Sequence, residues 1–148
     1  MREILFRGKR KDNSKWVEGW YVPPVDYSGS HWDASISYKV KAGHLEDVEA
    51  IPETVGQYTG LTDKNGKKIF EGDIVKADDF IFVVKFGKCG GVANAENYGY
   101  MGFYFEAFSE STKLSAKYGL RDDICYFTDI EVIGNIHDNP ELLKGGAE

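Results

Sequence analysis

VGQYTGLTDKNGKKIFEGDIV, residues 55–75, is the stretch that carries the strongest structural signal in this sequence of 148 residues. Its aromatic and β-branched residues flank the polar block Asp63-Lys64-Asn65-Gly66, a pattern typical of a β-hairpin. The block fits a type I turn followed by a glycine in the left-handed conformation, which makes a three-residue hairpin loop. Gly72 then interrupts an apolar run and predicts a bulge or a sharp bend, of the kind that helps a small barrel to close.

Upstream of this hairpin, the chain opens with a second predicted hairpin. Residues 4–10 and 15–22 read as its strands, and Pro23-Pro24 ends their pairing. Residues 25–37 read as a loop, with a strand only near residues 36–40. Because Pro52 cannot donate a ladder hydrogen bond, the segment around it is predicted to be an edge strand or an irregular approach.

Downstream, the predicted elements are again mostly strands. The nearly continuous apolar run at residues 80–86 is typical of a strand that is covered on both faces. Further strands are expected at 100–108, 124–127 and 130–137, with short helices at 111–119 and after Asn139-Pro140. The expected core comprises Phe70, Ile74, Phe82, Val84, Phe103, Phe105, Val132 and Ile136.

The composition supports one mainly β domain. The chain is 42% hydrophobic and 28% charged, and its 14% aromatic residues are spread along the whole length, which favours strands over an all-helical fold. We expect a single domain, 1–148, with an amino-terminal hairpin and irregular extension at 1–47, a barrel-like core at 48–143 and a frayed tail at 144–148.

Four stretches of the chain carry a family resemblance, and in order they are FRGK at 6–9, WVEGW at 16–20, residues 55–75 and IEVIGNIHDNPELL at 130–143. Together they resemble the YopX-like family of phage and prophage proteins. The resemblance implies a protein encoded by a phage or prophage, acting in the bacterial cytoplasm, with a small SH3-like, partly open or closed barrel plus additional hairpins and one or two short helices. The family's molecular role is undefined and it names no catalytic residues. Residues 25–47 and 87–123 follow no pattern of the family.

The distribution of charge ranks the classes of partner. The net charge is −6, yet residues 1–16 carry +4, so the remainder carries −10. An acidic body repels nucleic acid, and protein partners are therefore expected first. The many aromatic residues exceed what one small core readily hides, which predicts a homo-oligomer. No run of about 18 apolar residues suggests a membrane span, and no apolar signal peptide precedes the first strand, so a cytoplasmic location is expected.

Candidate residues for catalysis or metal binding are weak in this sequence. Paired acids at Glu71/Asp73, Asp78/Asp79 and Asp122/Asp123 could serve acid–base or metal chemistry, but acids at bends and turns are usually structural. The cysteines and histidines lack metal-ligand spacing, and the glycine-rich segment at 87–91 lacks the Lys-Ser/Thr ending of a phosphate loop. No cofactor, metal or enzymatic activity is expected. The histidines are His31, His44 and His137, and the cysteines are Cys89 and Cys125.

The remaining candidate site is a basic cluster beside an aromatic residue on the first hairpin. Such residues can hold a phosphate backbone while stacking bases, although cations on an edge hairpin also serve simply to block unwanted sheet pairing. The leading hypothesis is therefore a non-catalytic protein-binding module, the alternative is a weak nucleic-acid binder, and an enzyme comes third. The candidate contact residues for either kind of partner are Arg7, Lys9, Arg10, Lys11 and Trp16.

Overall fold

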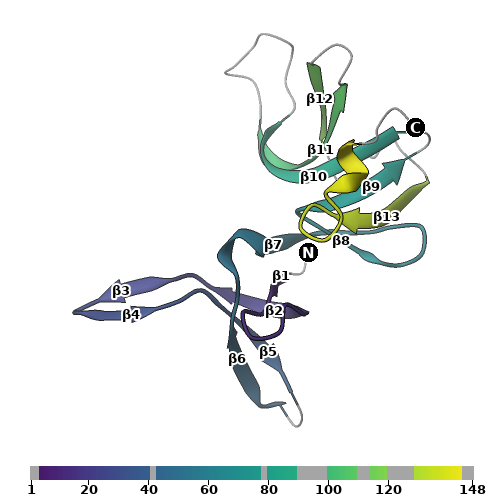
Figure 1. Cartoon of the computed structure of the whole chain (residues 1–148). Helices are drawn as coiled ribbons and strands as arrows, with labels where there is room; N and C mark the ends of the chain where they lie inside the picture. The colour runs from purple at the N-terminus through teal and green to yellow at the C-terminus, as the bar shows by residue number, and fades with distance from the viewer. Residues whose placement is uncertain are drawn as a thin grey trace. The chain divides into compact units, whose positions relative to one another are not determined.

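The computed structural model describes residues 4–40, 43–77, 80–89, 100–109, 114–119 and 129–144 (Figure 1). Within these residues the fold is mainly β, as predicted, with thirteen strands and a short carboxy-terminal helix. The strands form three sheets, none of which closes into a barrel, so the SH3-like barrel is not confirmed. None of the helices in these ranges is long and apolar enough to cross a membrane.

The chain divides into two compact units, Met1–Gly60 and Leu61–Glu148. The single domain with an internal boundary after residue 47 remains a prediction. Strand β7 runs through the division at residue 60. The first unit contains β1 (Phe6–Lys9), β2 (Trp16–Val22), β3 (Val25–Tyr27), β4 (Ser30–Trp32), β5 (Ser35–Lys39), β6 (Leu45–Glu49), the 3-10 turn η2 (Pro52–Thr54) and most of β7 (Gly56–Thr62).

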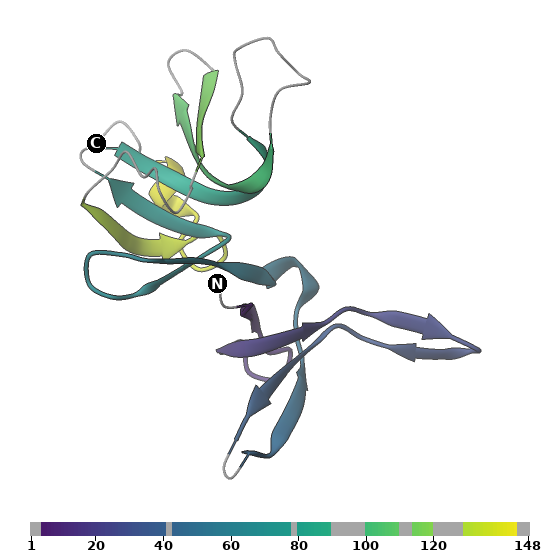
Figure 2. The ribbon, with the colours of Figure 1, turned by 180° about the vertical axis from the view of Figure 1, so that it is seen from behind.

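The first unit contains five of the six strands of an antiparallel sheet, in the order β6-β5-β2-β1-β7, together with a small group of buried apolar residues; the sixth strand is β8. Ile36 and Ala50 are fully buried there, and Gly8 lies so close to both that an added Cβ would touch them. Gly19 brings β2 against β5, because a Cβ at this position would lie 2.1 Å from the carbonyl oxygen of Ser37. The β3–β4 ribbon is a separate two-stranded sheet, and in both views it points in a different direction from the β5–β6 hairpin of the larger sheet (Figures 1 and 2).

The second unit is built on a five-stranded antiparallel sheet with the order β12-β11-β10-β9-β13. Its core is dominated by aromatic packing, in which the rings of Phe82 and Phe105 stack at 5.6 Å. The cluster comprises Ile69, Val75, Ala77, Phe82, Val84, Phe103, Phe105 and Ile130. The elements of this unit are β8 (Lys68–Phe70), β9 (Asp73–Ala77), β10 (Phe80–Cys89), β11 (Tyr100–Ser109), β12 (Leu114–Gly119), β13 (Ile130–Asn135) and α1 (Glu141–Lys144).

The hairpin and bend predicted from residues 55–75 are both present. Strands β7 and β8 flank a turn in which Gly66 has φ of 81°, the left-handed value that glycine adopts most readily. Asp63 fixes the turn, because its Oδ1 accepts hydrogen bonds from the backbone N–H groups of Asn65 and Lys67 at 2.9 and 2.8 Å. The chain bends at Gly72, with φ of 92°, before β9 begins.

Two predictions of local structure were wrong. Residues 25–37 are not a loop, since they contain β3, β4 and the start of β5. Residues 114–119 form β12 instead of part of a helix, because pairing along the length of β11 outweighs a marginal helix propensity. The strand predicted at 124–127 lies outside the described residues, as do residues 145–148 of the tail that was predicted to fray.

The core prediction was correct except at the strand edges. Six of the eight expected residues are buried, whereas Val132 and Ile136 are half-buried because they belong to or follow the edge strand β13. Contrary to the prediction, strand β10 is not covered on both faces along its length. On the face of the buried Phe82 and Val84, the flanking Phe80 and Phe86 are 60% and 45% exposed, and on the other face Ile81 and Val83 are only half-buried. The six buried residues are Phe70, Ile74, Phe82, Val84, Phe103 and Phe105.

Candidate functional site

The predicted basic site on the first hairpin divides into a buried part and an exposed part. Arg7 is only 9% exposed, and its guanidinium lies 4.6 Å from the centre of the Trp16 ring. Lys9, on the same face of β1, places its Nζ 5.5 Å from that ring. A cation held over an aromatic face contributes to folding through both charge and packing. Arg7 and Trp16 are therefore a packed pair within the sheet.

Two further cations of the predicted site, Arg10 and Lys11, lie beside carboxylates. Arg10 donates two hydrogen bonds to the carboxylate of Asp12, at 2.9 and 2.8 Å. The Nζ of Lys11 lies 3.6 Å from Asp33 and 3.9 Å from Glu49. Because acids of the same unit offset both charges, the positive potential at this turn is weaker than the sequence suggests.

The β3–β4 ribbon has two chemically different faces. The strands are joined by a two-residue turn, Ser28-Gly29, in which both residues have positive φ, as a type I′ turn requires. Val25 is paired with Trp32, and Tyr27 with Ser30, so these four side chains share one face. The three apolar residues of the face, Val25, Tyr27 and Trp32, are 43%, 72% and 58% exposed.

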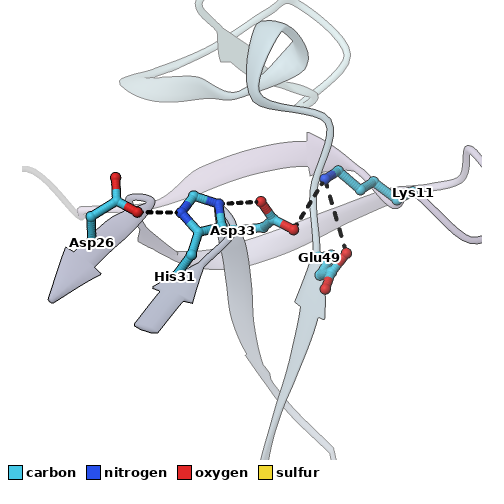
Figure 3. A network of polar contacts seen from close by, with 5 residues as sticks. All are labelled: Lys11, Asp26, His31, Asp33 and Glu49. Atoms are coloured by element: carbon cyan, nitrogen blue, oxygen red, sulfur yellow. Dashed lines mark hydrogen bonds and ion pairs between the residues drawn. The ribbon is translucent and has the colours of Figure 1, made fainter. Parts of the chain in front are cut away.

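The opposite face of the ribbon carries a polar network (Figure 3). Asp26 is paired with His31 across the strands, and its Oδ1 lies 2.6 Å from Nδ1 of the imidazole. The other ring nitrogen, Nε2, lies 2.8 Å from Oδ1 of Asp33. Asp33 in turn meets Lys11 of the β1–β2 turn, which also approaches Glu49 of β6. The network thus connects the ribbon to two other elements of the first unit.

The charges of this network stabilise one another. The hydrogen bond to Asp26 and then that to Asp33 raise the pKa of His31 above its ordinary value. The hydrogen bond to His31 and then the charge of Lys11 lower the pKa of Asp33. Ionised carboxylates only accept hydrogen bonds, so both contacts to the ring are satisfied together only when both nitrogens carry a proton. The geometry fits an imidazolium between two carboxylates.

Of the candidate catalytic acids that the structure describes, Glu71 lies in the turn after β8 and Asp73 is the first residue of β9. Asp73 is buried and accepts a hydrogen bond from the backbone N–H of Phe70 at 2.7 Å. The acid pairs at 78–79 and 122–123 lie outside the described residues, and so do Cys125 and residues 90–91 of the glycine-rich segment, whose residues 87–89 belong to β10. In the part of the chain that the structure describes, no three His, Cys, Asp or Glu residues form a group that could hold a metal ion.

A comparison with protein-family models finds a match over residues 5–144, to the family described as YopX protein. The chain belongs to the YopX family. The match covers both units and includes the β3–β4 ribbon, although the sequence of that segment follows no pattern of the family that we could identify. No curated protein matches the chain.

Among solved structures, this member of the YopX family is similar to protein EF1440 from Enterococcus faecalis, known from a crystal structure. The two sequences are 25% identical, and the alignment covers 97% of this chain and 99% of that chain. The TM-score is 0.45, a likeness that supports no inference about function.

The ribbon is the feature that sequence reasoning missed in this YopX protein. The signal was a Ser-Gly dipeptide between two short runs, each containing aromatic or β-branched residues, which can mark a two-residue hairpin. It was obscured because both faces of the ribbon are exposed, so no alternation between buried and exposed positions accompanies it.

Proposed function

We propose that this YopX protein is a phage- or prophage-encoded accessory protein that acts without catalysis, by binding a protein in the bacterial cytoplasm, and that the β3–β4 ribbon is its binding element. The observation that carries the proposal is the exposure of Val25, Tyr27 and Trp32 on one face of a two-stranded ribbon. Tyrosine and tryptophan are enriched at the energetic centres of protein interfaces.

The exposed aromatic residues are better explained by a contact site than by a structural role within the ribbon. Single exposed apolar side chains are normal on protein surfaces, but neighbouring ones more often mark contact sites. An isolated two-stranded ribbon also gains little stability by itself. Its conformation is supported by the turn at Ser28-Gly29 and by the network around His31, which leaves the aromatic face open to a partner.

Binding to nucleic acid remains the alternative, and the first hairpin gives it limited support. Arg7 is packed against Trp16, and Arg10 and Lys11 face acids of the same unit. A phosphate backbone would have to compete with these carboxylates, and the −10 charge beyond residue 16 adds repulsion. We expect no gel-shift of single-stranded or duplex DNA in about 150 mM salt.

Site-specific photocrosslinking tests the protein-binding proposal. A photoreactive phenylalanine analogue replaces Tyr27 in one version of the full chain and Lys67, an exposed turn residue of the second unit, in a control version. Both are expressed in phage-infected cells. We expect a discrete crosslinked protein from position 27 only, identified by mass spectrometry and then bound by the purified chain but not by its Trp32→Ser variant. Equal crosslinking from both positions, or from neither, would refute the proposal.

A further inference from the structure

The apolar face of the ribbon has large and small side chains on alternate corners. Tyr27 lies at the tip on β3 with Ser30 opposite, while Trp32 lies at the base on β4 with Val25 opposite. The two large side chains therefore occupy one diagonal of the face and the two small side chains the other. All four side chains are uncharged, and Asp26 and His31 project from the opposite face.

This diagonal arrangement is complementary to itself. A two-fold axis along the strands, between two such faces, places β3 of one copy over β4 of the other. Tyr27 then meets Ser30 of the second copy, and Trp32 meets its Val25. A two-fold axis across the strands places tip over base, so that Tyr27 meets Val25 and Trp32 meets Ser30 of the second copy. Each large side chain faces a smaller one under either axis, as an isologous interface requires.

We propose that the apolar face of the β3–β4 ribbon binds the same face of a second copy of this chain, forming a two-fold symmetric dimer. This inference rests on the proposed function, which gives the ribbon a binding role, and it identifies the partner as a second copy of the chain. Each chain has a net charge of −6, but the two paired faces carry no charged side chains, so their contact brings no like charges together.

The size of the face sets the strength of this dimer. The exposed fractions of Val25, Tyr27 and Trp32 correspond to roughly 350 Å² of apolar surface per chain. Two such faces bury less than the roughly 1,200 Å² at the low end of stable interfaces. The dimer therefore dissociates at low concentration. Because salt screens the repulsion between two acidic bodies, its affinity is maintained or increased as salt rises, the opposite of the behaviour of a nucleic-acid complex.

Sedimentation equilibrium of the purified full chain, over roughly one to several hundred micromolar, tests this dimer. We expect a reversible monomer–dimer equilibrium that Trp32→Ser weakens at least roughly tenfold. Ser30→Trp adds apolar area but places a large side chain opposite another one, so it should weaken the dimer too. Lys67→Trp, which adds the same side chain to the second unit, should leave the equilibrium unchanged. Circular dichroism verifies that each variant is folded.

Three outcomes would overturn the dimer: a wild-type chain that stays monomeric over the whole range, a Ser30→Trp variant that associates more tightly, or association that Trp32→Ser leaves intact. The first outcome together with crosslinking of a different protein from position 27 would remove the dimer and leave the proposed function standing. A monomer that also gives no crosslink from that position would remove both.

Discussion

The β7–β8 hairpin and the β3–β4 ribbon are both antiparallel pairs closed by short turns, but they differ in what their side chains contact. In the first, Ile69 is fully buried in the core of the second unit, and the turn is fixed by Asp63. In the second, Tyr27 and Trp32 contact solvent on one face and acids surround His31 on the other. Burial distinguishes the two: the hairpin contributes to stability, whereas the apolar face of the ribbon stays exposed, as its proposed binding role requires.

The largest expected effect is on the core of the second unit. Phe82→Ala removes one partner of the stacked pair with Phe105 and leaves a cavity, which should lower the free energy of unfolding by about 3–5 kcal/mol. Trp32→Ala on the ribbon should change it by less than about 0.5 kcal/mol. Urea denaturation followed by circular dichroism measures both. Equal losses from the two variants would contradict the contrast between a buried and an exposed pair of strands.

The next effect concerns Asp63, which binds the hairpin to β13. Its Oδ2 accepts a hydrogen bond from the backbone N–H of Val132 at 3.0 Å, in addition to the two bonds within the turn. Asp63→Ala removes all three acceptor contacts and should cost about 2–4 kcal/mol in urea denaturation. Asp26→Ala on the ribbon is the matched control and should cost less than about 0.5 kcal/mol. A loss from Asp63→Ala no larger than that of the control would show that the three bonds do not hold the hairpin.

The contribution of Asp63 also depends on pH. Burial raises the pKa of this carboxyl, but the backbone N–H groups of Val132, Lys67 and Asn65 outweigh burial and hold the pKa below its ordinary value. A lowered pKa in the folded state means that the stabilisation is present above the unfolded pKa of about 3.9 and is lost as pH falls through the folded pKa. The difference in stability between wild type and Asp63→Ala should therefore shrink below about pH 4.

The same contrast explains how far the sequence could predict the fold. The turn at Asp63–Gly66 and the apolar residues around it give two signals that agree, one from turn chemistry and one from burial. For that reason the hairpin, the bend at Gly72 and most of the core were predicted correctly. The ribbon gives only the turn signal at Ser28-Gly29, because neither of its faces is buried.

The candidate site was harder to predict than the fold. The sequence identified cations near Trp16, but it could not show that Arg7 points into a packed pair or that Asp33 and Glu49, distant in sequence, approach Lys11. The acids that offset the charge of Lys11 lie far from it in the sequence and approach it only in the folded structure. Composition alone therefore overestimated the basic character of the first hairpin.

A smaller effect is expected at Arg7, which tests the buried part of that hairpin. Arg7→Ala removes the packing and the charge over Trp16 and should lower the free energy of unfolding by about 1–3 kcal/mol. Arg10→Ala, which breaks an exposed pair with Asp12, should have a clearly smaller effect, because solvent screens that pair. Thermal and urea denaturation of the two variants give the comparison. If both changes are equally small, Arg7 is a surface residue and returns as a candidate contact to phosphate.

The smallest expected effect is the titration of His31 on the polar face of the ribbon. Its pKa is raised by the hydrogen bond to Asp26 and then by that to Asp33, so its stabilisation is complete below the unfolded pKa of about 6.5 and is lost as pH rises through the folded value. Asp33 sets the acidic limit of the network. Its pKa is lowered, so its contribution to stability is lost as pH falls through its folded pKa. The full set of contacts therefore exists in mildly acidic solution.

Nuclear magnetic resonance titration of the imidazole measures this directly in wild type and in Asp26→Asn. We expect the titration midpoint of His31 to lie above the ordinary histidine value and to fall in the variant, because the amide replaces an ionised acceptor. The dimer equilibrium should be the same on either side of that midpoint, since His31 and Trp32 project from opposite faces. A midpoint at or below the ordinary value, or one that Asp26→Asn does not move, would show that the two carboxylates do not hold the ring. A dimer that dissociates as His31 loses its proton would show instead that the polar face takes part in the contact, and the two faces of the ribbon would then have to be treated as one surface.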